Sequence, residues 1–319
     1  MALYDKTALG AQADDLGFIR DTFEKVVRLR AILAFIDADP LLSDALALKG
    51  GTAINLTVFE LPRLSVDIDL DYTRNNSLAT MTTEREQISQ LIARYMTGQG
   101  YHASGKSREH HSLDGMVWAY TNAAGVADNI KVEINYSMRA HVLPTERRPL
   151  LALGEGATRT LAPIEIYSSK IVALLTRAAP RDLYDIDHLV EADLFAEPDQ
   201  RGLLRRCVVF YLAVGTDEIP DLAGFSRILE LTPRRIRTQL QPVLRKRDWF
   251  DLPAAQRRVT EYLSDLLRLE PNEQEFLDCF RDGRWTPELL FDGDMLDRVR
   301  QHPMAVWKLN LNPPARFGS

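Results

Sequence analysis

Two aspartates separated by a single residue are the first side chains whose spacing indicates chemistry. Asp67 and Asp69 alternate with Ile68 and Leu70. Side chains alternate between the two faces of a strand, so we expect both aspartates, with Asp71 as a further candidate, to share one face. Carboxylates spaced about 6–7 Å apart along a strand repel one another without a counter-ion. Mg²⁺, with Mn²⁺ as the alternative, is a hard cation that prefers oxygen ligands and would relieve that repulsion.

A glycine pair upstream of the aspartates is typical of a phosphate site. Gly50-Gly51-Thr52 lets backbone amides approach an anion closely, and the start of a following helix favours phosphate. Ser65 precedes Asp67 by two residues. It would share the aspartate face and contact phosphate, or it is an ordinary strand serine. The sequence therefore predicts that Gly50, Gly51, Thr52 and Ser65 bind a nucleotide.

A third carboxylate comes from a second alternating segment. Glu133 lies between Val132 and Ile134. A neighbouring strand that places Glu133 beside Asp67 and Asp69 would complete a two-metal site for phosphoryl or nucleotidyl transfer. An alternating pair of aspartates is also typical of a solvated strand face. The glycine turn and Glu133 favour the metal site, with Asp67, Asp69 and Glu133 as its ligands.

These motifs resemble those of a known family. Residues 46–56, LALKGGTAINL, and residues 61–72, LPRLSVDIDLDY, resemble the AbiEii/AbiGii family, the nucleotidyltransferase toxins of bacterial type IV toxin–antitoxin systems, which include the MenT-type toxins. The family's later signature is a helix lysine followed by Arg-Asp-x-x-Asp. Lys170 and residues 181–185 match that signature. The resemblance extends over most of residues 17–308.

One spacing departs from the wider nucleotidyltransferase superfamily. Fourteen residues separate Thr52 from Asp67, which exceeds the usual number. The departure leaves open the shape of the loop around Leu61-Pro62-Arg63.

The resemblance assigns roles to a helical segment that the residues alone leave open. Lys170 and Arg177 lie seven residues apart on one face of a helix, within reach of triphosphate oxygens. A single lysine is also typical of a solvated face, and the resemblance favours the functional role for Lys170. Asp182 would orient Lys170 or contact a nucleotide hydroxyl. Asp185 would act in the same way or support its helix.

The resemblance implies an enzyme that transfers NMP from an NTP to an RNA acceptor with Mg²⁺. For the MenT-type members the acceptor is the tRNA 3′ end, whose modification blocks aminoacylation and arrests growth. It also implies a cognate antitoxin, without a direct complex being predicted. The catalytic residues would be Asp67, Asp69, Lys170 and Asp182. The alternatives are transfer to a small molecule or protein, and a nucleotide-binding regulator without turnover.

Charge is distributed unevenly along the 319 residues. The net charge is −6, which excludes bulk coating of nucleic acid. Residues 232–268 nevertheless carry a local excess of +5, from nine basic and four acidic residues. Basic helices with Trp249 and Phe250 between them suit an RNA backbone, whereas solvated faces with a buried Trp249 are the alternative. The basic residues are Arg234, Arg235, Arg237, Arg245, Lys246, Arg247, Arg257, Arg258 and Arg268.

The patterning predicts an α+β (α/β) fold, with a mixed sheet core of nucleotidyltransferase type followed by an all-helical C-terminal domain. Residues 1–155 would form the catalytic domain and residues 156–319 the helical one. Alternating runs at 115–121 and 129–136 predict antiparallel strands joined by a turn. Apolar spacing predicts helices over 17–38, 84–97, 164–178, 184–192, 202–214, 225–231, 233–244 and 255–269.

The remaining features concern the compartment. Cys207 and Cys279 lack metal-ligand spacing, so two reduced thiols and a cytoplasmic protein are expected. No stretch approaches about 18 consecutive apolar residues, so no membrane span is expected.

Overall fold

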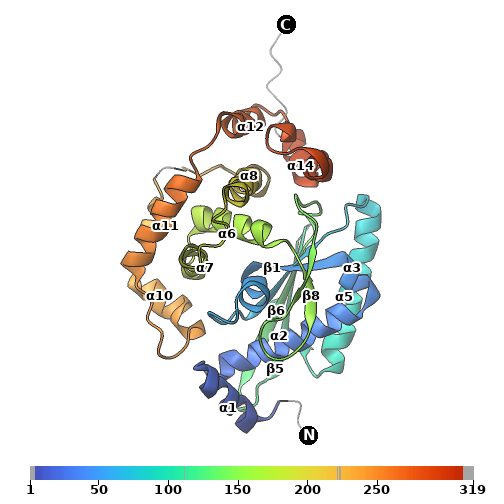
Figure 1. Ribbon diagram of the computed structural model, residues 1–319. Coiled ribbons are helices and arrows are strands. Elements are labelled where there is room, and N and C mark those ends of the chain that lie inside the picture. The colour runs from blue at the N-terminus through green and yellow to red at the C-terminus, as the bar shows by residue number, and fades with distance from the viewer. Residues whose placement is uncertain (1–3, 111, 221, 223, 312–319) are drawn as a thin grey trace. The chain divides into compact units, whose positions relative to one another are not determined.

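The computed structural model describes residues 4–110, 112–220, 222 and 224–311 (Figure 1). The chain divides into two compact units. The first unit comprises Met1–Arg139, Thr145–Leu161 and Leu240–Trp249, and the second comprises Ala140–Pro144, Ala162–Gln239 and Phe250–Ser319. The predicted α+β class is confirmed, with a mixed sheet in the first unit and helices in the second. The boundary near residue 155 stays a prediction.

The first unit is built on one mixed sheet of eight strands, in the order β3-β5-β6-β2-β1-β8-β7, with β4 paired to β5. β2 runs parallel to β6, β1 runs parallel to β8, and the other pairs are antiparallel. The predicted hairpin is confirmed, since β5 and β6 pair over their whole length. The strands are β1 Leu46–Lys49, β2 Asp67–Tyr72, β3 His102–Ala103, β4 Arg108–His110, β5 Leu113–Thr121, β6 Ala127–Asn135, β7 Glu146–Pro149 and β8 Ala157–Thr160.

Helices α2 and α5 are the long helices of this unit (Figure 1). The first predicted helix, 17–38, begins later than expected. Gly17 has a φ of 80° and ends a preceding helix, so α2 starts only at Arg20. The helical elements are α1 Lys6–Leu16, α2 Arg20–Ala38, α3 Pro40–Ala45, α4 Gly50–Ala53, the π-helix Ile54–Val58, α5 Leu78–Gly98 and the 3₁₀ turn Gln241–Val243.

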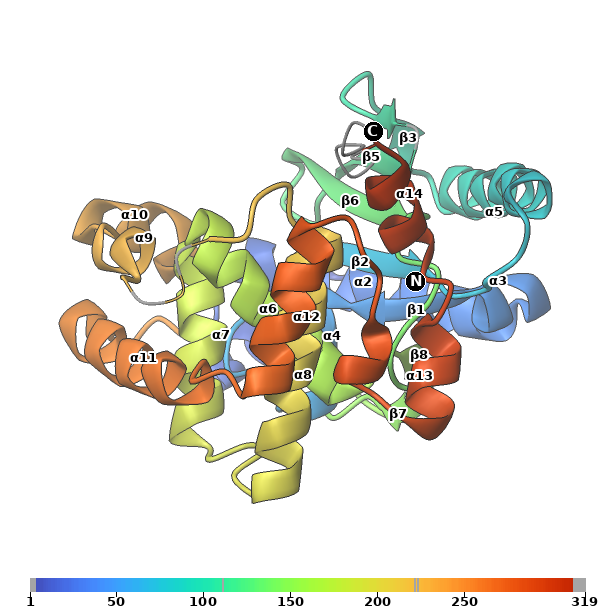
Figure 2. The same cartoon turned by 90° about the horizontal axis from the view of Figure 1, so that it is seen from above.

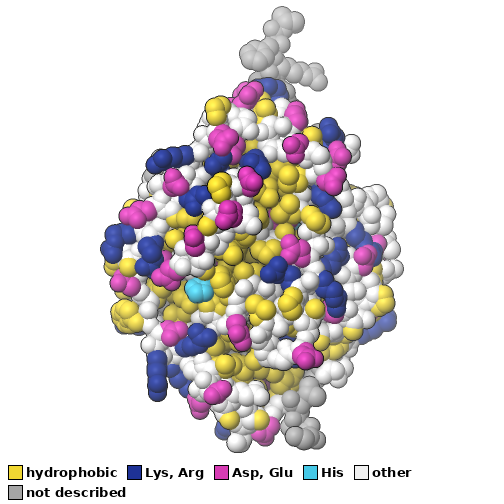
Figure 3. Space-filling model, in the orientation of Figure 1, with side chains coloured by type: hydrophobic (Ala, Val, Ile, Leu, Met, Phe, Trp, Pro, Cys, Tyr) yellow, Lys and Arg dark blue, Asp and Glu magenta, His cyan; other side chains and the backbone are white. Residues whose placement is uncertain are grey.

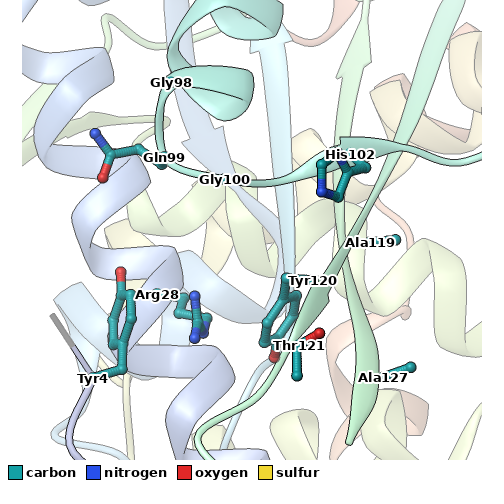
Figure 4. A pocket seen from close by; sticks show the side chains of 10 residues that line it. All are labelled: Tyr4, Arg28, Gly98, Gln99, Gly100, His102, Ala119, Tyr120, Thr121 and Ala127. Atoms are coloured by element: carbon teal, nitrogen blue, oxygen red, sulfur yellow. The ribbon is translucent and has the colours of Figure 1, made fainter. Parts of the chain in front are cut away.

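A cavity of about 580 Å³ lies in the first unit beside Arg28 (Figure 4). The guanidinium of Arg28 lies 3.7 Å from the ring centroid of Tyr4 and 4.2 Å from that of Tyr120. Its Nε donates to the buried carboxylate of Glu24 at 2.9 Å, and Glu24 also accepts the backbone N–H of Ala123 at 2.9 Å. These bonds tie the hairpin turn to α2 and satisfy a cation that would otherwise be costly to bury.

The second unit is helical (Figure 2). Helix α6 packs on α7 and α8, α11 packs on α7, and α12 and α14 pack on α8. Glu165 accepts hydrogen bonds from Tyr211 at 2.6 Å and from the backbone N–H of Val142 at 2.7 Å, which joins Ala140–Pro144 to these helices. The helices are α6 Pro163–Arg177, α7 Pro180–Glu191, α8 Pro198–Gly215, α9 Ser226–Leu229, α10 Pro233–Gln239, α11 Leu252–Leu266, α12 Pro271–Arg281, the 3₁₀ turn Pro287–Leu289, α13 Gly293–Val299 and α14 Pro303–Leu311.

The predicted helix over 233–244 is wrong in its second half. Helix α10 ends at Gln239 and a short 3₁₀ turn follows at Gln241–Val243. Pro242 lacks a backbone N–H and restricts the residue before it, so the α-helix cannot continue through this point.

In the part of the chain that the structure describes, no helix is long and apolar enough to cross a bilayer. Cys207 and Cys279 are both buried and free.

Candidate active site

The predicted carboxylates share one face of two adjacent strands. In the parallel pairing of β2 with β6, Asp67 lies opposite Lys131 and Asp69 lies opposite Glu133. Directly paired residues share a face, with their strands about 4.8 Å apart. Ile68 is fully buried on the other face. We call Asp67, Asp69, Asp71, Lys131, Glu133 and Lys49 the acidic face.

Two lysines on this face contact its carboxylates, and neither was singled out by the sequence patterns. Lys49 Nζ lies 2.5 Å from Asp71 Oδ1, and Asp71 is almost fully buried. Lys131 forms an ion pair with Glu133. Partial burial lowers the pKa of Lys131, but the hydrogen bond to Glu133 and the charges of Glu133, Asp67 and Asp69 outweigh burial and raise the pKa above its usual value. A lysine two residues before Glu133 in an alternating strand was the signal in the sequence.

The donor chemistry of the acidic face suits a divalent cation. Asp67 and Asp69 are half-buried and supply hard carboxylate oxygens on the same side of one strand, the ligands that Mg²⁺ and Mn²⁺ accept. Within residues 4–110, 112–220, 222 and 224–311, however, no three carboxylate, imidazole or thiolate side chains are placed to hold a metal ion together. Asp67, Asp69 and Glu133 as a shared ligand set stay a prediction.

The glycine turn packs directly against the side chain of Asp69. Gly50 has a φ of +66°, a conformation that favours glycine, and it begins α4 at the end of β1. A Cβ at Gly50 would lie 2.6 Å from Asp69 Oδ2, so a side chain there requires the carboxylate to move. The absence of a side chain therefore allows the backbone turn and the aspartate to approach each other.

The long spacing after Thr52 is taken up by the π-helix Ile54–Val58 and a folded loop. Arg63 in that loop is 1% exposed, and a Cβ at Gly51 would lie 2.6 Å from its guanidinium and 3.0 Å from Ser65 Oγ. Ser65 thus lies beside the glycine turn, and its contact with phosphate stays a prediction. Thr52 is buried, and its hydroxyl donates to the backbone carbonyl of Asp67 at 2.5 Å. Thr52 therefore ties the turn to β2.

Further bonds hold the same turn. The Asn55 side-chain amide donates to the Gly51 carbonyl at 2.6 Å, and its oxygen accepts the backbone N–H of Arg63 at 3.2 Å. The Arg63 guanidinium donates to the Leu64 carbonyl at 2.9 Å. Sequence reasoning did not identify Asn55, which lies at the centre of this network.

In the second unit, Lys170 is held by two carboxylates. Lys170 on α6 lies 3.0 Å from Asp182 Oδ1 and 3.1 Å from Asp185 Oδ2 on α7. Arg177 Nε lies 2.9 Å from Asp182 Oδ2. Asp182 and Asp185 therefore both hold the Lys170 ammonium in place, and the catalytic roles of Lys170 and Asp182 stay predictions. Ala178, with a φ of 45°, separates the two helices and allows α7 to fold back along α6.

Charge stabilises the ionised form of Asp182. Burial alone would raise the pKa of Asp182, but Lys170 and Arg177 outweigh it and hold the pKa below its ordinary value of 3.8. The side chains of Lys170, Asp182 and Asp185 are all less than 10% exposed, whereas that of Arg177 is 66% exposed.

The mixed sheet, the glycine turn and the paired aspartates are features that fit a nucleotidyltransferase, and the family match gives this class of protein. Residues 32–282 match the family model described as Nucleotidyl transferase AbiEii toxin, Type IV TA system. The chain therefore belongs to the AbiEii family of nucleotidyltransferase toxins, and the resemblance seen in the motifs is confirmed.

Solved structures with a similar fold include MenT4, a nucleotidyltransferase toxin from Mycobacterium tuberculosis H37Rv. The match has a TM-score of 0.62 and 17% identity, and it covers 90% of this chain and 93% of that one. A putative nucleotidyltransferase from H. pylori matches with a TM-score of 0.49 and 15% identity, over 79% of this chain and 96% of that one. A comparison with curated proteins gives no match.

The fit between Gly50 and Asp69 leads to a first prediction. We expect Gly50→Ala to lower the free energy of unfolding by about 1–2 kcal/mol, because an L side chain is strained at positive φ and the new Cβ displaces Asp69. Nucleotide transfer should fall as well. The measurement is urea unfolding together with a transfer assay.

Gly10→Ala is the matched control. Gly10 lies inside α1 with nothing within 4 Å of its added Cβ, so alanine should stabilise the protein by about 0.5–1 kcal/mol. Equal stability of the two variants would show that neither the positive φ of Gly50 nor its contact with Asp69 requires a glycine at this position.

The buried pairing of Lys170 leads to a second prediction. We expect Lys170→Met to lower the free energy of unfolding at pH 7 by about 3–5 kcal/mol, because it leaves Asp182 and Asp185 buried without their cation. Arg177→Met, at an exposed partner, should cost about 1 kcal/mol or less.

The pH dependence has a defined sign. The folded-state pKa of Asp182 is lowered, so the stabilisation is present above pH 3.8 and is lost as the pH falls through the lowered pKa. The difference between wild type and Lys170→Met in urea unfolding should therefore shrink as the pH is lowered toward 3. A difference that stays constant would contradict the ion pair as its cause.

Proposed function

We propose that this toxin transfers NMP from an NTP to the 3′ end of tRNA in a reaction that requires Mg²⁺. The acceptor hydroxyl oxygen attacks the α-phosphorus, the bond between the α- and β-phosphates breaks, and pyrophosphate leaves with the electron pair. The observation that carries the proposal is the placement of Asp67 and Asp69 on one face of β2, with the Gly50 turn packed against Asp69. This is the arrangement of carboxylates beside a backbone cradle that phosphoryl transfer uses.

Asp67 and Asp69, with Glu133 on the neighbouring strand, would hold the divalent cation. When bound, Mg²⁺ would neutralise phosphate charge and lower the pKa of the acceptor hydroxyl. The backbone amides of Gly50, Gly51 and Thr52 would contact the triphosphate, with the Ser65 hydroxyl beside them. Lys170, held in the second unit by Asp182 and Asp185, would act as a catalytic cation, the role that the family resemblance implies for it.

The segment Leu240–Trp249 supports RNA as the acceptor. Trp249 is 88% exposed, so the alternative of a buried tryptophan is wrong. Arg247 is also exposed and has no ion pair within the described residues. An exposed indole ring beside a free guanidinium suits an unpaired base and its phosphate.

Two other basic residues of the 232–268 region are less available. Arg258 pairs with Asp187 at 2.7 Å and with Glu191 at 2.8 Å, and Lys246 pairs with Asp14 at 2.7 Å. Arg234 and Arg237 are exposed, and Figure 3 shows Lys and Arg side chains interspersed with acidic and apolar ones over the face that it draws. We therefore assign RNA contact to Trp249 and Arg247 of the first unit.

Modified tRNA ends could not be aminoacylated, so translation and growth would stop. As a member of a type IV toxin family, the protein would be opposed by a cognate antitoxin. Growth arrest on expression, relieved by the antitoxin, is the cellular outcome of the proposal.

The proposed reaction is tested with labelled NTPs, Mg²⁺ and total tRNA. We expect wild type to label tRNA and Asp69→Asn to lose about 100-fold or more of the rate, because removing a cation ligand costs several kcal/mol in the transition state. Asp128→Asn is the matched control, since Asp128 lies on β6 but pairs with Lys25 at 2.7 Å.

The acceptor is identified by parallel reactions. Intact tRNA should be labelled. Periodate-oxidised tRNA lacks the 3′ diol and should not be labelled, and protein or small-molecule acceptors should not be labelled either. Equal transfer by wild type and Asp69→Asn would overturn the mechanism. Labelling of oxidised tRNA or of protein would overturn the assignment of the tRNA 3′ end as the acceptor.

The RNA surface leads to a separate prediction. We expect Trp249→Ala to weaken tRNA binding about ten-fold, because base stacking on an aromatic ring contributes about 1–3 kcal/mol. Arg247→Ala should reduce the slope of log affinity against log salt by about one. Filter binding at several salt concentrations measures both.

Trp307→Ala is the control, because Trp307 is another exposed tryptophan, at 52%, on α14. It should leave tRNA affinity unchanged. If the two tryptophan variants bind tRNA equally well, Trp249 is not a stacking platform.

A further inference from the structure

Lys131 holds an unusual position for a surface lysine. It lies directly opposite Asp67 across the β2–β6 pairing and two residues before Glu133 on the same strand. It shares the acidic face with both and forms an ion pair with Glu133. The side chains are 43% exposed for Lys131 and 27% for Glu133, so the pair is reached by solvent and ions.

Among the described residues, the three predicted ligands do not form a common metal site, and one of them is held in an ion pair. Asp69 and Glu133 are cross-strand partners, and their strands lie about 4.8 Å apart. Their backbones are therefore close enough for both carboxylates to reach one cation. Yet no group of three such ligands is assembled anywhere in the described ranges. Glu133 is instead engaged by the ammonium group of Lys131.

We propose that Lys131 is the built-in counter-cation of the acidic face, holding Glu133 when no metal is bound and competing with the divalent cation for that carboxylate. This inference rests on the proposed metal-dependent function. Metal entry would then break the Lys131–Glu133 ion pair, bring Glu133 to Asp69 and leave the Lys131 ammonium beside the site. Lys131 would thus offset part of the negative charge of Asp67, Asp69 and Glu133 before metal binding, and the metal ion would offset it afterwards.

The other lysine of the acidic face has a different role. Lys49 pairs with Asp71, whose side chain is 4% exposed. That pair neutralises the buried charge of Asp71 near the C-terminal end of β2. Lys131 instead lies near the more exposed carboxylates at the N-terminal end of the strand. It pairs with Glu133, a carboxylate that is predicted to bind metal.

The test is Mn²⁺ binding by calorimetry without NTP or acceptor. We expect Lys131→Met to bind Mn²⁺ about three- to ten-fold more tightly than wild type, because the competing cation is gone. Its unfolding midpoint without metal should be lower, and the rise of the midpoint on adding Mn²⁺ should be larger than in wild type. Lys131→Arg, which keeps the charge, should bind Mn²⁺ close to wild-type affinity.

Two controls isolate the cause. Lys25→Met removes a lysine that pairs with Asp128 on the same strand, β6, outside the acidic face, and it should leave Mn²⁺ affinity unchanged. In a Glu133→Gln background, the Lys131→Met substitution should lose most of its effect on affinity, because the carboxylate for which the two cations compete is absent.

The outcomes separate this inference from the proposed function. Unchanged or weaker Mn²⁺ binding by Lys131→Met overturns the competition even if wild type transfers NMP to tRNA. Weaker NTP binding by Lys131→Met with unchanged Mn²⁺ affinity would make Lys131 a phosphate contact and also overturn it. Tighter Mn²⁺ binding that depends on Glu133 supports it whatever the acceptor of the reaction proves to be.

Discussion

Repulsion between carboxylates held on one sheet face is the constraint on which the site depends. Asp67, Asp69 and Glu133 are brought together because the opposite faces of β2 and β6 are apolar and buried. A shift of one residue in either strand would bury its charges, so the core sets the register. The protein tolerates the resulting charge by placing lysines on the same face, Lys49 at Asp71 and Lys131 at Glu133.

The glycine turn depends on the same strand. Gly50 fits against the Asp69 carboxylate, and the Thr52 hydroxyl bonds to the backbone of Asp67. The proposed phosphate cradle and the proposed metal ligands are therefore positioned by each other. The buried Arg63 and Asn55 support the turn from the segment between Thr52 and Asp67. This segment is the one that is longer than usual for the superfamily. The backbone of the glycine turn, which is proposed to bind phosphate, is thus held by side chains that need not contact substrate.

A second charge arrangement follows similar physics in the helical unit. Burying Lys170 is costly unless opposite charges accompany it, and Asp182 and Asp185 provide them from the next helix. With two acceptors at about 3 Å, the ammonium group has little freedom to move. In the proposed reaction this arrangement would orient a cation before substrate arrives, which would reduce the entropy lost on binding.

The sequence by itself determined the alternating strands, the hairpin, most helices and the family, because local periodicity and short motifs carry that information. It also indicated that Asp182 could orient Lys170. Only the tertiary structure decided which charges meet, as with Lys131 and Glu133 beside Asp69, and whether Trp249 is buried or exposed. The physical reason is that strand register, burial and ion pairing depend on residues far apart in the chain. A single strand or helix pattern shows which face a side chain takes but not which neighbour it meets there.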